Sequence, residues 1–230
     1  MSVSENHTPS APTPTVSLDW ADRTEQALLE AALTRIPALG FSRTTVLAAG
    51  AELGLSPAEC DLLLPYGAQD LAALYARRLE HSATERLANT DLASQKIREK
   101  IRLGLTARLD AAAEHKDVTH RWAGFLALPG NLPLALRLVW DASEAIWRAA
   151  GDTATDENHY SKRAIVSGIL MAALVTRLTQ GEKAASTLVD ERISNVMAFE
   201  KWKATQTFRP DTLLRDLASQ LGALRFKALP

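Results

Sequence analysis

Cysteine is almost missing from this 230-residue sequence, in which Cys60 is the only one. A single thiol excludes a disulfide within the chain and any zinc site built from several cysteines. Glycine and proline are also scarce, with 11 and 10 residues respectively. Because these two residues interrupt helices, and alanine and leucine dominate the remainder, the composition favours a helical protein.

An excess of either charge is absent as well, since the formal net charge is -1. No global field therefore attracts the chain to nucleic acid. The longest central apolar run, residues 164–175, is shorter than the roughly 20 residues that span a bilayer. Residues 1–16 have no Lys, no Arg and no apolar core, so they match neither a secretory signal nor a mitochondrial presequence. We expect a disordered tail here, on a bacterial cytoplasmic protein.

Apolar residues recur at helical spacing along most of the chain, without a strand pattern or a repeat. The sequence predicts an all-α fold of about nine to ten helices. We expect the helices at about residues 18–36, 43–53, 56–64, 68–88, 94–115, 132–150, 156–179 and 183–203, with a last one from residue 209. Residues 94–115 should present a basic outer face.

Residues 40–65, GFSRTTVLAAGAELGLSPAECDLLLP, have the pattern of a helix-turn-helix. Ser56 and Glu59 form a capping box that begins the second helix. Together with residues 28–39, this segment resembles the N-terminal head of tetracycline-repressor-type regulators. Its would-be recognition helix has Glu59 and Asp61 but no Lys or Arg, and Arg43 is the only base of the segment. Because DNA affinity comes mainly from basic residues, we predict that the chain does not bind DNA.

Residues 128–164, LPGNLPLALRLVWDASEAIWRAAGDTATDENHYSKRA, resemble an accessory protein family of coenzyme Q (ubiquinone) biosynthesis, the ninth subunit of the coenzyme Q synthome. Residues 189–201, VDERISNVMAFEK, resemble the family's following helix. The resemblance implies a tetracycline-repressor-like homodimer that carries an isoprenoid, a quinone or a phospholipid. It implies that the protein presents demethoxyubiquinone to a di-iron hydroxylase at the membrane, without catalysis or a cofactor of its own. A ligand-responsive repressor is the alternative.

The sequence pattern and the resemblance together divide the chain into a tail (1–16), a helix-turn-helix-like head (17–66), a lipid-binding and dimerisation bundle (67–207) and a C-terminal amphipathic helix (208–230). The predicted lipid-binding residues are apolar or aromatic: Trp122, Phe125, Leu126, Leu136, Trp140, Trp147, Ile169 and Met171. The predicted partner-binding residues surround the next turn: Gly151, Asp152, Asp156, His159, Tyr160, Lys162 and Arg163. In this second group we expect an aromatic ring and two cations to form a docking patch.

The last helix should lie on an anionic membrane, because its apolar and basic residues segregate to different faces. Its predicted membrane-binding residues are Leu213, Leu214, Leu217, Leu221, Leu224, Arg225 and Lys227. We therefore expect a peripheral protein of the bacterial cytoplasmic membrane. No nucleotide-binding or hydrolase motif is present, and the two Asp-x-x-His pairs lack the glutamates of a di-iron site. The sequence thus predicts neither an enzyme nor a metal site.

Overall fold

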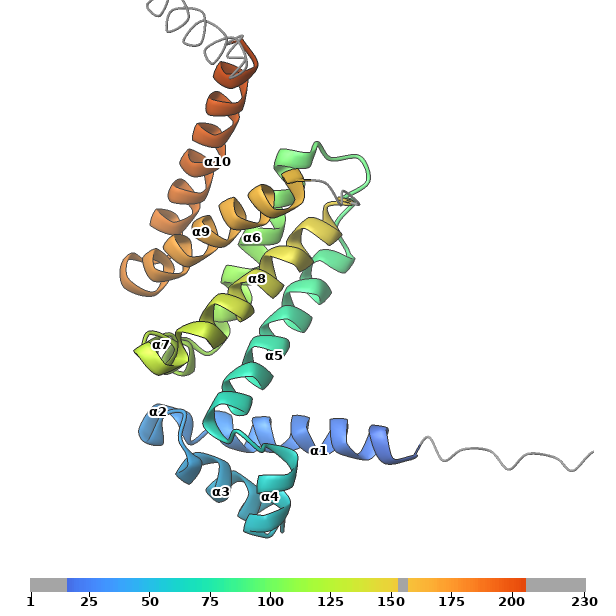
Figure 1. The fold of residues 1–230 in the computed structure, drawn as a ribbon, viewed down its shortest axis with the longest axis vertical. Helices are drawn as coiled ribbons and strands as arrows, with labels where there is room; N and C mark the ends of the chain where they lie inside the picture. The colour runs from blue at the N-terminus through green and yellow to red at the C-terminus, as the bar shows by residue number, and fades with distance from the viewer. Residues whose placement is uncertain (1–15, 153–156, 206–230) are drawn as a thin grey trace, which may run out of the picture.

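The computed structural model describes residues 16–152 and 157–205, which are almost entirely helical (Figure 1). Within these ranges there is no strand, and the predicted all-α fold is confirmed. The helices are α1 (Val16–Leu33), α2 (Ile36–Leu39), α3 (Arg43–Glu52), α4 (Pro57–Leu63), α5 (Ala68–Ala88), α6 (Ile97–Glu114), α7 (Lys116–Leu126), η1 (Pro129–Asn131), α8 (Leu132–Ala149), α9 (Glu157–Gln180) and α10 (Glu182–Thr205).

Helices α1 to α4 form the head, which lies beneath the other helices in Figure 1. The predicted caps are present: the Ser42 hydroxyl accepts a hydrogen bond from the Thr45 amide, and Ser56 and Glu59 form the capping box. The helix expected over 18–36 ends earlier, at Leu33. A separate short helix follows it, because Pro37 lacks the amide hydrogen that would continue α1.

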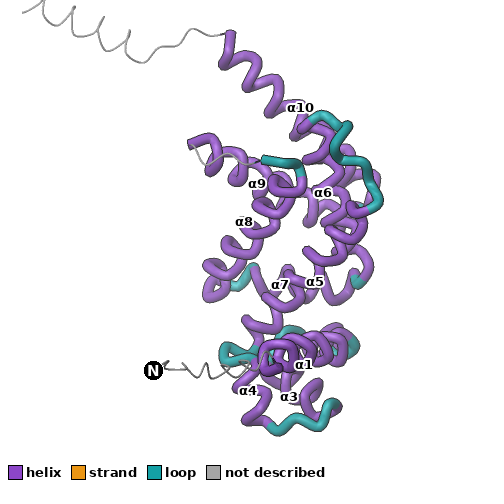
Figure 2. The backbone as a smooth tube through the Cα atoms, turned by 90° about the vertical axis from the view of Figure 1, so that its right-hand side faces the viewer, coloured by secondary structure: helices purple, strands orange, loops and turns teal. Residues whose placement is uncertain are grey.

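Helices α5 to α10 form a bundle in which α6 packs against α5, α8, α9 and α10. Figure 2 shows α5 leading from the head into this bundle, and Figure 1 shows α10 running beyond the end of α9. The sequence did not predict α7 as a separate helix. The chain leaves the helical conformation between α6 and α7 at His115, with φ −120° and ψ 65°, and neither glycine nor proline marks that position.

One continuous apolar core joins the head to the lower part of the bundle. Its buried polar groups are paired: the Trp122 indole N–H donates to the Ala72 carbonyl (2.9 Å), and the Tyr75 and Thr119 hydroxyls lie 2.7 Å apart. On α7, Arg121 Nε donates to the Pro37 carbonyl of α2 (3.1 Å). The head is therefore held against the bundle by the shared core and by the hydrogen bond from Arg121, and the proposed division at residue 66 stays a prediction.

No described helix is by itself long and apolar enough to cross a membrane. Lys116–Leu126 and Pro129–Ala149 meet these criteria only as a pair, and they are bent by 92° relative to each other. The predicted C-terminal amphipathic helix (208–230), with its membrane-binding residues Leu213 to Lys227, lies outside the described residues. Residues 1–15 of the predicted tail also lie outside them.

Candidate functional site

An apolar cavity of about 260 Å³ lies among α6, α7, α8 and α9. Its walls are made almost entirely of aliphatic side chains and one tryptophan ring, as is typical of sites that bind lipids or other apolar ligands. Four of the eight predicted lipid-binding residues line it. These four are Trp122, Leu126, Leu136 and Met171.

The mouth of the cavity is apolar too, because some of the lining side chains are also half exposed. Leu132 and Leu136 of α8 have 54% and 55% of their surface accessible, and Met171 and Val175 of α9 have 52% and 60%. Large apolar side chains that gather at a surface indicate a contact with a lipid, a membrane or another protein. We call these four residues the rim.

The other four predicted lipid-binding residues lie elsewhere. Phe125 packs into the head core, with its ring centroid 5.8 Å from that of Phe41. Trp140 pairs with Tyr160, at 6.1 Å between ring centroids. Trp147 and Ile169 line a second, smaller apolar cavity of about 90 Å³ beside α10.

Helical rise explains why residues on one face of α8 do not all reach the main cavity. Leu136 and Trp147 share a face of α8, but eleven residues of helix separate them by about 16 Å along its axis. One face of α8 therefore serves two cavities, one near each end. The shared face is visible in the sequence, but the axial position at which the neighbouring helices leave a space is not.

Arg108 of α6 is the polar residue of the main cavity, and the sequence analysis missed it. Only 6% of its surface is exposed, and its Nε is buried without a hydrogen-bond partner. Burial lowers its pKa to about 10, although the charges of Glu80 and Tyr75 act in the opposite direction. Within the described residues, no ion pair or hydrogen bond engages its guanidinium group.

The expectation that the segment 94–115 has its basic residues on an outer face is therefore wrong for Arg108. Arg108 follows the buried residues Gly104 and Leu105 by four and three positions, which places it on the inward face of α6. That spacing was visible in the sequence. A basic residue within an apolar stripe was the available signal.

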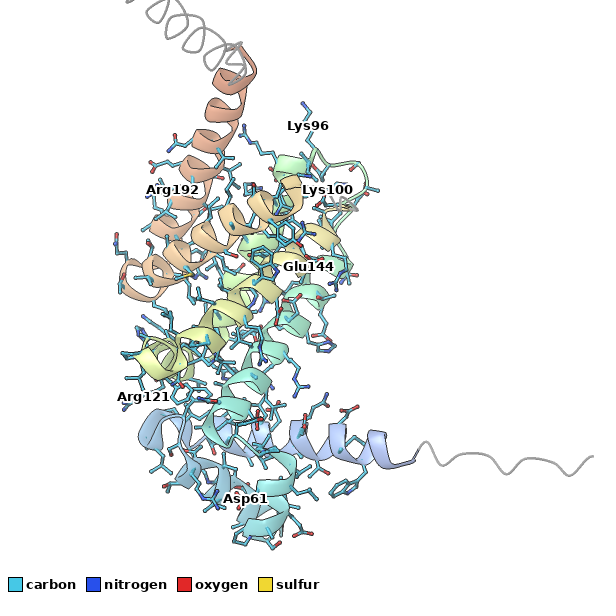
Figure 3. The ribbon with its side chains drawn as sticks, in the orientation of Figure 1. Asp61, Lys96, Lys100, Arg121, Glu144 and Arg192 are labelled. Atoms are coloured by element: carbon cyan, nitrogen blue, oxygen red, sulfur yellow. The ribbon has the colours of Figure 1, made fainter. Side chains whose placement is uncertain are left out.

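The turn after α8 is held by a buried network of charges. Arg163 of α9 has a side chain that is only 2% exposed, and it forms ion pairs with Glu144 of α8 and with Asp152 (3.3 Å). Lys162 Nζ lies 3.0 Å from the other Asp152 oxygen and 5.3 Å from the centroid of the Trp147 ring. Figure 3 labels Glu144 on α8, which packs against α9.

The pKa shifts in this network follow from its geometry. Burial opposes ionisation of Asp152, but hydrogen bonds and charges from Lys162 and Arg163 outweigh it and lower the pKa of this carboxyl. The hydrogen bond to Glu144 is the main cause of a raised pKa at Arg163. The network keeps its members ionised and stabilises the junction of α8 and α9.

The predicted docking patch is therefore wrong in part. Arg163 and Asp152 do not form an exposed contact surface, because each is buried against an opposite charge. Gly151, at φ 85°, supplies the left-handed turn that ends α8. Tyr160 is 66% exposed and lies against Trp140, so this aromatic pair forms the accessible part of the patch. Asp156 and the side chain of His159 lie outside the described residues.

Residues 40–65 of the head offer no unpaired basic side chain. Arg43 is engaged by Asp61, with its two terminal nitrogens 2.5 Å and 2.8 Å from the two carboxylate oxygens. Figure 3 shows Asp61 in the head, far from the bundle. The only base of residues 40–65 is thus paired with an acid. Glu59 adds a negative charge on the same helix, whereas Glu52 is itself paired with Arg35 (2.5 Å). Among the described residues, no three His, Cys, Asp or Glu side chains gather as a metal site would require.

Comparisons with known proteins bear on both the family and the fold. Residues 132–200 match the family model described as COQ9. The chain is 28% identical over 155 residues to ubiquinone biosynthesis protein COQ9 of Xenopus tropicalis, covering 64% of this chain and 49% of that protein. It is 28% identical over 154 residues to the same protein of Bos taurus, covering 64% and 48%. The chain thus spans about half the length of these relatives, and the predicted resemblance is confirmed.

Among solved structures, the chain is similar to a TetR transcriptional regulator from Nitrosomonas europaea ATCC 19718. The TM-score is 0.56 at 13% identity, and the match covers 77% of this chain and 98% of that one. A likeness at this identity concerns the fold. It confirms the tetracycline-repressor-like architecture.

The predicted location on the bacterial cytoplasmic membrane is wrong. It is overturned by the COQ9 relatives from Xenopus tropicalis, Bos taurus and Homo sapiens, which are all named as mitochondrial proteins. The prediction rested on the composition of residues 1–16 and on the amphipathic pattern of the last helix. Both segments lie outside residues 132–200, which match the family model.

Proposed function

We propose, from the match of residues 132–200 to the COQ9 family model, that this chain acts in ubiquinone biosynthesis as a non-catalytic lipid-binding protein. In this proposal it binds an isoprenoid, a quinone or a phospholipid. It presents demethoxyubiquinone to the di-iron hydroxylase of the pathway at a membrane surface. The protein supplies an apolar compartment and a docking surface, and the chemistry belongs to the hydroxylase.

The observation that carries the proposal is the apolar cavity among α6 to α9, with its half-exposed apolar rim. An apolar chain that leaves a bilayer needs a continuous apolar path, since each exposed methylene costs about 0.8 kcal/mol. The rim residues Leu136 and Met171 supply the start of that path, and Trp122 and Leu126 supply its interior.

The aromatic pair of Trp140 and Tyr160 supports docking on a protein partner. Exposed aromatic residues are enriched at interface hot spots, and rigid support of such residues lowers the entropy lost on binding. Here the support comes from the buried network of Arg163, Glu144 and Asp152, which begins three residues after Tyr160 on α9.

Lipid extraction from the purified full chain, followed by mass spectrometry, tests the binding function. We expect an isoprenoid, quinone or phospholipid in the wild-type protein and much less in Ala142→Phe, which places a ring in the cavity. Ala149→Phe, at an exposed position of the same helix, is the matched control. A wild-type protein without lipid, or equal lipid in all three proteins, would contradict the proposal.

The pathway assignment has its own test. Expression of the chain in cells that lack their own COQ9 protein should restore ubiquinone and reduce demethoxyubiquinone. Tyr160→Ala should restore less ubiquinone than the wild-type chain, while lipid content stays the same. An unchanged quinone profile with the wild-type chain would refute the pathway role.

A further inference from the structure

Arg108 is unlike the other buried arginine of the bundle, because no carboxylate among the described residues pairs with it. Its Nε is buried without a partner, and its side chain lines a cavity that otherwise consists of apolar groups. Glu80, on α5, is near enough to influence the guanidinium electrostatically, yet the two do not form an ion pair. A charge removed from water without a partner costs several kcal/mol. Such an arrangement is suited to a ligand that brings the opposite charge.

We propose that Arg108 binds the anionic head group of an amphiphile, a carboxylate or a phosphate, inside the cavity. This inference rests on the proposed lipid-binding function and adds the chemistry and the orientation of the ligand. The guanidinium group presents a planar fork of N–H donors that matches two oxygens of a carboxylate or phosphate. A neutral alcohol offers one oxygen and no charge.

The orientation follows from the two ends of the cavity. Arg108 comes from α6, the helix that packs against five others, whereas the half-exposed rim comes from α8 and α9. A head group at Arg108 therefore sends its tail outward past Leu136 and Met171. The tail remains in apolar surroundings along this route.

The size of the cavity limits what lies inside it. Its volume of about 260 Å³ is below the roughly 300–1,000 Å³ typical of pockets that enclose a whole drug-sized ligand. It holds a head group and the first part of one chain. A long chain must continue outside, over the apolar rim.

Titration calorimetry of the full chain with three ligands that share one tail tests the proposal. The ligands are dodecanoate, dodecyl phosphate and dodecanol, each used below the concentration at which it self-associates. We expect at least one of the two anions to bind about tenfold or more tightly than the alcohol, as for other charge-assisted hydrogen bonds. The tighter of the two identifies the source of the anionic head group, a fatty acid type or a phospholipid type.

The variants assign the preference to a residue. Arg108→Met should bind all three ligands alike, and Arg108→Lys should keep part of the preference because it keeps the charge. Arg137→Met, at an exposed position of α8, should behave as the wild-type protein. Circular dichroism of each variant establishes that it is folded.

The outcomes separate this inference from the proposed function. If the wild-type protein binds the alcohol as tightly as the anions, lipid binding stands and the role of Arg108 is refuted. That role is equally refuted if Arg108→Met retains the preference, or if Arg137→Met loses it. If no ligand of the three binds, both the inference and the lipid-binding function fail.

Discussion

Arg108 and Arg163 place the same chemical group in opposite situations. Both are almost fully buried, but Arg163 is paired with Glu144 and Asp152, whereas Arg108 faces an apolar cavity. Removing one partner of a buried pair leaves an uncompensated charge, while removing a lone buried charge relieves one. The two residues should therefore respond differently to the same substitution.

We predict that Arg163→Met lowers the free energy of unfolding by about 3 kcal/mol or more, because Glu144 and Asp152 lose their common partner. Arg108→Met should leave the free energy of unfolding unchanged or raise it by roughly 1 kcal/mol, since no ion pair is lost. Urea denaturation of both variants measures the difference. A comparable loss in both would show that Arg108 has a structural partner of its own.

Asp152 gives the network a dependence on pH. Its pKa in the folded protein is lowered from 3.8, so its contribution to stability is complete above that pH and is lost as the pH falls below it. Asp152→Asn removes this titration. We predict that the wild-type protein is more stable than Asp152→Asn at neutral pH and that the difference shrinks below about pH 3.8.

Denaturant unfolding of the two proteins between pH 6 and pH 3, at constant ionic strength, measures this difference in stability. A difference that stays constant over this range would mean that Lys162 and Arg163 do not lower the pKa of Asp152. The sequence suggested Asp152 as a docking residue. It did not reveal that Glu144, eight positions earlier on α8, shares Arg163 with it.

At the scale of elements, α6 and α8 approach each other at a glycine. A Cβ atom added to Gly104 would lie 2.9 Å from Cγ2 of Ile146, a branched and buried side chain that has little room to move. Gly168 of α9 is also helical, but an added Cβ there meets nothing within 4 Å. The two glycines form a natural pair of test and control.

We predict that Gly104→Ala destabilises the protein by about 1–3 kcal/mol through overpacking, whereas Gly168→Ala stabilises it by up to about 1 kcal/mol through helix propensity. Thermal unfolding followed by circular dichroism compares the two. Equal shifts in Tm would show that α6 and α8 have freedom to move apart.

The helices were largely predictable because caps and apolar spacing are local properties. Ser56 and Glu59 marked the beginning of α4, and the apolar spacing marked α8 and α9. The boundary at His115 carried no local signal and was missed. The position of the cavity depends on where the helices of the bundle leave a space between them, which is not a local property of the sequence. Only four of the eight predicted lipid-binding residues therefore line it.

At the scale of the whole molecule, the rim residues form an apolar surface on α8 and α9. Leaving Met171 and Val175 half exposed is unfavourable, and a second copy of the chain would cover them. This surface supports the homodimer that the family resemblance implied. It also coincides with the opening of the cavity.

We predict that Val175→Asp converts a dimer into a monomer in light scattering after size-exclusion chromatography, because each interface would have to bury two new charges. Thr84→Asp, at an exposed position of α5, should not change the mass. A wild-type protein that is monomeric at micromolar concentrations would contradict the prediction.

The shared position of the rim and the mouth has a thermodynamic consequence. If two copies meet over the mouth, the tail of a bound lipid becomes part of their interface, and ligand occupancy alters the affinity of one copy for the other. Reciprocity then requires self-association to alter lipid affinity by the same factor. If self-association strengthens lipid binding, dilution of the loaded protein promotes lipid release. If self-association weakens lipid binding, dilution promotes lipid retention.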